Sequence, residues 1–244
     1  MTKLGLDYPT EWGRRATTRA TRDLLYRCWI APYMRYSAFL DVRGLANVTG
    51  PGPLILVANH TSNLDTPLIL SSLPPSVRRR TVVAAAMDSF FMNPRAAFRT
   101  VLLFNAIPFD RHSLNRRSAQ QALELVRQGW NLLIYPEGGR TTDGNLGDFK
   151  GGAAYLAERS HATVVPTYVH ESGFLRGPKY AKAPQFIQGP SRRRHHVVVA
   201  FGEPLSSLEG ESVRRYGSRI ERAVTDLGRQ VSGNPLYGAR PEDD

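Results

Sequence analysis

The sequence predicts an α/β fold, in which a mixed β-sheet is flanked by helices and follows an N-terminal pair of helices. Short apolar runs, some of them β-branched, recur along the chain, and residues 54–58 and 131–135 are the clearest. Runs of this length between turn-forming residues are typical of buried strands. Stretches of helical period separate them, as in α/β proteins. The 244 residues, of which 41% are hydrophobic, suffice for one domain with a sizeable core.

The helical pair is expected in residues 1–41. One helix should span 12–30, and a second should begin near Pro32 and end at Leu40, because proline suits a first helical turn. The main domain is then expected over residues 42–232 and a C-terminal tail over 233–244. Within the main domain the pattern predicts strands at 54–58, 81–86, 131–135, 163–169 and 197–201, and helices at 66–73, 113–128, 153–160 and 208–230.

Three arginines of the first helix, Arg15, Arg19 and Arg22, recur at helical spacing and therefore share one face. Tyr26 and Trp29 continue the same line. Arginines followed by large aromatic residues suit a membrane interface, where the cations meet lipid phosphates and the rings lie at headgroup depth. The alternative is an amphipathic helix that packs on its own domain and leaves its arginines in solvent.

The charge balance points to an anionic partner. The chain has 32 basic and 21 acidic residues, for a net charge of +11. Such a balance fits either nucleic acid or an anionic membrane surface. No nucleic-acid-binding signature is present, so we expect a membrane surface and no nucleic acid. The single cysteine, Cys28, excludes an intrachain disulfide, and the scattered histidines predict no metal site. No apolar run is long enough to span a membrane, and the N-terminus lacks a signal region.

The densest group of reactive side chains follows the strand at residues 54–58. His60 comes directly after this strand, where α/β folds place their ligands, and Asp65 falls in the first turn of the next helix. A carboxylate at this spacing can hydrogen-bond to the imidazole and stabilise its protonated form. The pair therefore has what a general base needs to take a proton from a hydroxyl. A capped turn with a satisfied histidine is the structural alternative.

Two further groups also follow apolar runs. The strand at 131–135 leads into Pro136, Glu137, Gly138, Gly139, Arg140 and Thr141. Adjacent glycines let backbone N–H groups approach an oxyanion, and an arginine offers a planar fork for phosphate oxygens. The stretch 105–111 likewise ends in an arginine, Arg111. Either group alone could be an ordinary turn with a solvated arginine.

In this order the groups resemble the motifs of the glycerolipid acyltransferase family. The matching residues are Asn59, His60 and Asp65 for the first motif, Ile107 to Arg111 for the second, Tyr135 to Thr141 for the third, and Val164 to Pro166 for the fourth. Phe149-Lys150-Gly151-Gly152 and the stretch 201–205 also look like family landmarks. The resemblance covers about residues 42–205. It implies a glycerol-3-phosphate acyltransferase-like fold.

The resemblance also implies a reaction, the transfer of a fatty acyl group from acyl-coenzyme A or acyl carrier protein to the hydroxyl of a lysophospholipid. The first candidate acceptor is 1-acylglycerol-3-phosphate, in phospholipid biosynthesis. His60 and Asp65 would be catalytic, whereas Arg111, Glu137, Gly138, Gly139, Arg140 and Thr141 would bind substrate. Acyl-coenzyme A is a co-substrate, so no cofactor is expected. The protein would be peripheral on the cytoplasmic face of the cell membrane, with residues 173–194 as a basic surface loop near headgroups or the coenzyme.

The chain also departs from the family pattern. Gly139 replaces the usual threonine of the third motif, and residues 81–88 lack the usual lysine. These departures leave the acceptor open, and a glycolipid or another lysophospholipid is the nearest alternative. A non-catalytic protein that binds anionic membranes is an alternative of a different class. A hydrolase, in which His60 activates water, is a third.

Overall fold

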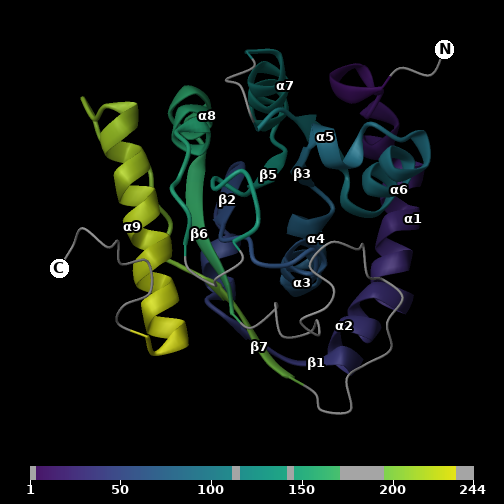
Figure 1. The fold of residues 1–244 in the computed structure, drawn as a ribbon, viewed down its shortest axis with the longest axis horizontal. Coiled ribbons are helices and arrows are strands. Elements are labelled where there is room, and N and C mark those ends of the chain that lie inside the picture. The colour runs from purple at the N-terminus through teal and green to yellow at the C-terminus, as the bar shows by residue number, and fades with distance from the viewer. Residues whose placement is uncertain (1–3, 112–115, 142–145, 171–194, 235–244) are drawn as a thin grey trace.

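The structure, a computed structural model, describes residues 4–111, 116–141, 146–170 and 195–234. Within these residues seven strands form one sheet, in the order β1-β7-β6-β2-β5-β3-β4 (Figure 1). They are β1 (Ala38–Arg43), β2 (Leu54–Ala58), β3 (Thr81–Ala86), β4 (Ala106–Phe109), β5 (Asn131–Ile134), β6 (Thr163–His170) and β7 (His195–Phe201).

The sheet is mixed. The strands from β6 to β4 are parallel to one another, whereas β7 runs antiparallel to β6 and β1 runs parallel to β7. The predicted α/β class, a mixed sheet flanked by helices, is confirmed. The helices are α1 (Ala16–Leu25), α2 (Ala31–Ser37), α3 (Asp65–Ser72), α4 (Pro75–Arg78), α5 (Met87–Phe90), α6 (Pro94–Phe104), α7 (Arg116–Arg127), α8 (Gly152–Ser160) and α9 (Val213–Ser232).

Each face of the sheet has its own hydrophobic layer. Alternate residues of β2 belong to different layers, Leu56 to one and Ile55 to the other, because successive strand side chains point to opposite faces. The layer of Leu56 also contains residues of α2, α3 and α6, and the layer of Ile55 contains residues of α7, α8 and α9. Figure 1 shows α8 and α9 on one side of the sheet and α1 and α2 on the other. Burial on both faces explains why β2 is a continuous apolar run.

The N-terminal helices differ from the prediction in three ways. The first helix begins at Ala16 and not at Trp12, because the backbone of Arg15 is extended. The backbone stays helical from α1 to α2, because a π-helical turn (Tyr26–Ile30) joins them. The second helix ends at Ser37 and not at Leu40, since the next residues form β1. This strand gains its hydrogen-bonding partner from β7, far along the chain, which local helix patterning cannot register. The boundary expected between residues 41 and 42 falls inside β1.

Arg22 was expected on a lipid-facing surface, and this expectation is wrong. The side chain is buried, with 5% of its surface exposed. Its guanidinium donates to the carbonyls of Leu102 (2.7 Å), Val101 (2.9 Å) and Gly13 (2.9 Å). Two of these carbonyls belong to the last turn of α6, where that of Val101 also accepts the N–H of Asn105 at 3.0 Å. Arg22 therefore joins α1 to the end of α6.

None of the described helices combines the length and the apolar character that crossing a membrane would require.

The carboxyl ends of β2, β3, β4, β5 and β6 all lie at one edge of the sheet, because these strands are parallel. The residues that follow these strands are thereby brought to the same edge.

Candidate active site

His60 lies in the short connection between β2 and α3 and contacts Asp65, the first residue of α3. The imidazole Nδ1 is 2.8 Å from Asp65 Oδ2. The same oxygen accepts the backbone N–H groups of Thr61 and Ser62, each at 2.8 Å. The Asp65 side chain is fully buried, whereas that of His60 is 18% exposed. A carboxylate at Nδ1 favours the tautomer with its proton on that nitrogen, which leaves Nε2 as the basic nitrogen.

The third motif holds the backbone of His60 in place. Glu137 Oε1 accepts the N–H of His60, and Oε2 accepts the N–H of Gly147, both at 2.8 Å. The N–H of Thr141 donates to the carbonyl of His60 at 2.9 Å. Glu137 was predicted to bind substrate. These bonds favour instead a role in fixing the turn, since both carboxylate oxygens already accept backbone N–H groups.

Tyr135, which was not predicted as a site residue, stacks on His60. The ring centroids are 4.1 Å apart and the planes are inclined by 22°. The Tyr135 hydroxyl is 2.8 Å from Thr66 Oγ1, next to Asp65 in α3. Burial, together with the nearby Asp65 charge, raises the pKa of Tyr135 well above its usual range, so the phenol stays neutral. Its position at the end of the apolar run of the third motif is the one signal that could have identified it.

Asn59 has a structural place in the first motif. Its amide donates to the carbonyl of Val169 (3.1 Å) and accepts the N–H of the same residue (2.8 Å). This side chain is 1% exposed. It extends the pairing of β2 with β6 by one residue and so fixes where the chain turns toward His60.

Arg111 lies at the same edge but is already engaged. Its Nη2 and Nε donate to Asp88 Oδ2 at 2.7 and 3.2 Å, and its Nη1 donates to the carbonyl of Gly138 at 3.2 Å. The ion pair is half-exposed. The Nζ of Lys150 donates to the carbonyl of Arg111 at 2.6 Å. The structure thus brings Arg111 to the third motif, as predicted, and adds Asp88 and Lys150, which the sequence analysis did not assign to the site.

The two glycines of the third motif differ. Gly138 has φ +70°, a conformation that favours glycine, and its N–H donates to the carbonyl of Tyr135 at 3.2 Å. Its N–H therefore closes the turn and is not available to an oxyanion. The N–H of Gly139 makes no such bond to a described residue. A Cβ on Gly139 would meet no atom within 4 Å, so this side of the turn is open.

The remaining predicted residues flank this turn. Arg140 is exposed, and it forms no ion pair within the described part of the chain. The hydroxyl of Thr141 is buried and makes no hydrogen bond to any described residue. The described residues contain no group of three or more His, Cys, Asp or Glu side chains that could hold a metal ion. The predicted surface loop at 173–194 lies outside the described residues.

Comparison with known proteins identifies the family of the chain. The family model described as Acyltransferase matches residues 39–170, more than half of the chain. A probable 1-acyl-sn-glycerol-3-phosphate acyltransferase of Mycoplasma pneumoniae is 28% identical over 72% of this chain and 68% of its own. The human 1-acyl-sn-glycerol-3-phosphate acyltransferase beta is 29% identical over 82% of this chain and 68% of its own.

The fold has a counterpart among solved structures. The crystal structure of the 1-acyl-sn-glycerophosphate acyltransferase of Thermotoga maritima superimposes with a TM-score of 0.62 at 20% identity, and the match covers 91% of this chain and 83% of the other. The fold, the matched family model and the ordered motifs agree, and the chain belongs to the acyltransferase family.

Proposed function

We propose that the protein transfers a fatty acyl group from an acyl thioester, acyl-coenzyme A or acyl carrier protein, to the hydroxyl of a lysophospholipid. The first candidate acceptor is 1-acylglycerol-3-phosphate, the substrate in the names of the two relatives. The observation that carries the proposal is the buried carboxylate of Asp65 at 2.8 Å from His60 Nδ1. The third-motif turn that binds the backbone of His60 also contacts the cations Arg111 and Lys150. The geometry combines a general base with groups that suit a phosphate.

In the proposed reaction, His60 Nε2 takes the proton of the acceptor hydroxyl as its oxygen attacks the thioester carbonyl carbon. The new C–O bond forms, the C–S bond breaks, and the departing thiolate takes the proton from the imidazolium. The Asp65 carboxylate stabilises the imidazolium between these steps, because it faces Nδ1. The acyl group passes directly to the acceptor, so no acyl-enzyme is needed.

The tetrahedral oxyanion needs a hydrogen-bond donor near His60. The N–H of Gly139 is the best candidate, since Gly138 uses its own N–H within the turn. A donor of this kind is typically worth about 3–4 kcal/mol. The predicted oxyanion site at the two glycines is therefore narrowed to one of them.

Membrane attachment is the second part of the proposal, and the structure supports a different surface from the arginine face. Trp29 is 74% exposed, and Tyr36 and Phe39 are 57% exposed each. Arg27 and Arg35 are exposed on the helical segment that contains Trp29 and Tyr36, and Phe39 follows it in β1. Aromatic rings with neighbouring arginines suit the headgroup region of a bilayer. We therefore propose that the enzyme binds peripherally to an anionic membrane through this aromatic surface of Trp29, Tyr36 and Phe39.

The proposal can be tested with purified protein, mixed acyl-coenzyme A donors and a panel of lysolipids, with products identified by mass spectrometry. The expected result is acylated 1-acylglycerol-3-phosphate with wild type and none with His60→Ala. Transfer to a glycolipid and to no lysophospholipid would show that the proposed acceptor is wrong. Loss of thioester without any acceptor would identify a hydrolase, and full activity of His60→Ala would refute the mechanism.

A further inference from the structure

The third-motif turn carries a cation that the reaction scheme leaves unused. Lys150 Nζ donates to the carbonyl of Arg111 at 2.6 Å. The same nitrogen lies 2.8 Å from the position that a Cβ on Gly138 would occupy. The Lys150 N–H donates to the carbonyl of Pro136 at 3.0 Å, so the backbone of this residue is tied to the turn as well. Lys150 is thus held against the residues that position His60.

The charges of this cluster decide which cation is available to an anion. The guanidinium of Arg111 pairs with the carboxylate of Asp88 at 2.7 Å, which compensates its charge. The partner of the Lys150 ammonium is a neutral carbonyl, and no carboxylate of a described residue lies within ion-pair distance of it. An ammonium has three N–H donors, and the carbonyl of Arg111 uses one. Of Arg111 and Lys150, it is therefore Lys150 that carries the uncompensated positive charge, in addition to the exposed Arg140 of the third motif.

We propose that Lys150 is a specificity residue that binds the phosphate monoester of the acceptor, in concert with Arg111. This inference rests on the proposed acyl transfer and names the substrate class of that site, a lysolipid with a terminal phosphate. A phosphate monoester carries about −1.5 to −2 charges near neutral pH, so it interacts with an uncompensated ammonium more strongly than a neutral glycolipid does. Because Asp88 compensates the charge of Arg111, Arg111 would orient the phosphate through hydrogen bonds, and Lys150 would supply the positive charge that attracts it.

The competing explanation is that Lys150 only braces the turn through the carbonyl of Arg111. The two roles predict different kinetics. A brace affects every acceptor alike, because it acts through His60 and its neighbours. A phosphate ligand affects the KM of phosphate-bearing acceptors and spares the kcat. Lys150→Met keeps most of the aliphatic stem and removes the charge, whereas Lys150→Arg keeps the charge.

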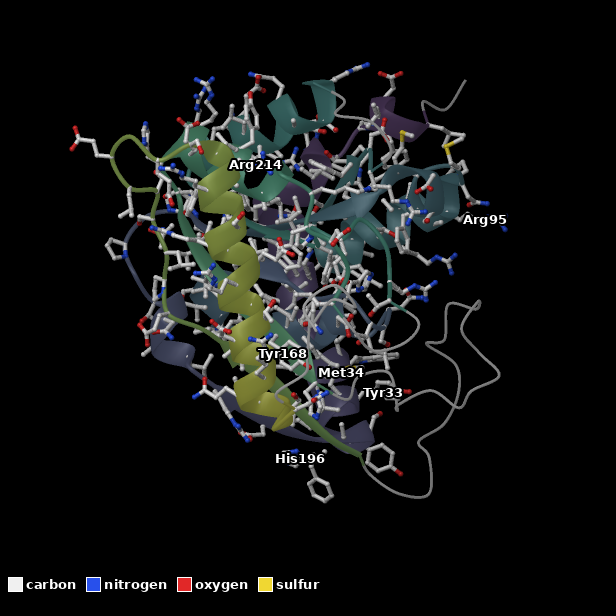
Figure 2. All side chains as sticks on the ribbon, turned by 60° about the vertical axis from the view of Figure 1, so that its left-hand side comes forward. Tyr33, Met34, Arg95, Tyr168, His196 and Arg214 are labelled. Carbon is white, nitrogen blue, oxygen red and sulfur yellow. The ribbon has the colours of Figure 1, made fainter. Side chains whose placement is uncertain are left out.

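The test compares wild type, Lys150→Met and Lys150→Arg with two soluble short-chain acceptors, a monoacylglycerol and its 3-phosphate. For Lys150→Met we expect the KM of the phosphate acceptor to rise at least tenfold, with kcat within about threefold and the phosphate-free acceptor unchanged. Lys150→Arg should recover most of the lost affinity. The matched control is Arg214→Met, since Arg214 is exposed on α9. Figure 2 shows Arg214 remote from Tyr168, which lies near the carboxyl end of β6.

Direct binding separates this inference from the proposed function. Glycerol 3-phosphate is titrated calorimetrically into wild type and into Lys150→Met. Binding that weakens at least tenfold in the variant supports the phosphate site, even if no acyl transfer is found with any acceptor. Equal binding to both proteins, no binding to wild type, or an equal kinetic loss for both acceptors would overturn the assignment of Lys150.

Discussion

Replacing Asp65 by Asn removes one charge from the active site while keeping its hydrogen bonds. Asp65 Oδ2 lies 2.8 Å from His60 Nδ1 and accepts two backbone N–H groups, each at a distance of 2.8 Å. The carbonyl oxygen of an asparagine at this position can accept from the same three donors. The fold should therefore persist, and the change beside the imidazole is electrostatic.

The expected magnitude follows from the distance and the burial. An imidazolium and a carboxylate whose charges lie about 4 Å apart attract each other by about 4 kcal/mol at an effective dielectric constant of about 20. That constant suits this pair, because His60 is 18% exposed and Asp65 is fully buried. Each 1.36 kcal/mol of transition-state stabilisation corresponds to a tenfold rate. The amide dipole of the introduced asparagine replaces part of the attraction, so we expect kcat to fall by about 10²–10³-fold.

The assay is kcat at saturating donor and acceptor, with the melting temperature as the control for folding. Asp65→Ala is the contrasting variant, because it leaves the N–H groups of Thr61 and Ser62 without their acceptor and should also lower the melting temperature. His60→Ala should lose at least as much activity as Asp65→Asn. The double variant of His60→Ala and Asp65→Asn should be no slower than His60→Ala alone, since the two residues act as a unit.

Two outcomes would refute this reasoning. One is an Asp65→Asn enzyme that folds normally and keeps more than a tenth of the wild-type kcat. The other is a double variant whose loss is the product of the two single losses, because independent residues multiply their effects.

Three other predictions address the stack, the core and the membrane. Tyr135→Leu should lower kcat about tenfold and Tyr135→Phe only about twofold, since the ring and not the hydroxyl faces the imidazole. Equal kcat values for these two variants would argue against a role of the stacked ring. Arg22→Met should lower the free energy of unfolding by about 3–5 kcal/mol in urea titrations, because the three hydrogen bonds from the buried guanidinium to backbone carbonyls are lost, whereas Arg15→Met should change it by less than about 0.5 kcal/mol. A double variant, Trp29→Ser with Phe39→Ser, should sediment at least tenfold less with anionic vesicles at low salt and keep its activity on a soluble acceptor; unchanged sedimentation would remove the aromatic surface from the proposal.

Much of the sheet could be predicted because its strands are locally encoded. β2 and β3 have the bounds that the apolar runs indicate. The turn before β2 contains Gly and Pro at residues 50–53, and the burial of both strands on both faces makes the runs continuous. The meeting of His60, Arg111 and the third motif was also predictable, since parallel strands end at one edge. The strand bounds depend on residues close together in the sequence, and the meeting of the motifs follows from the parallel arrangement that the α/β class implies.

The features that could not be predicted depend on distant partners. Helical spacing places Arg22 on the same face as Arg15, but spacing does not reveal that the carbonyls of Val101 and Leu102 lie against it. β1 follows a helix directly, and only β7, far later in the sequence, gives it a reason to be extended. Lys150 was visible as a landmark, but its contact with Arg111 arises from the fold.

The structure also changes what the conspicuous residues do. Glu137 stands in the third motif like a substrate ligand, yet its two oxygens tie the backbone of His60 to Gly147. Arg111 looks like a phosphate fork, yet its charge is matched by Asp88. Both motifs therefore use their charged groups to hold one another and His60. This arrangement fixes the position of the His60 imidazole, and catalysis requires this because a proton acceptor must be kept within hydrogen-bond reach of the hydroxyl. The acceptor must then be recognised by groups that still have hydrogen-bonding capacity, and among the described residues at this edge these include the N–H of Gly139, the guanidinium of Arg140 and the ammonium of Lys150.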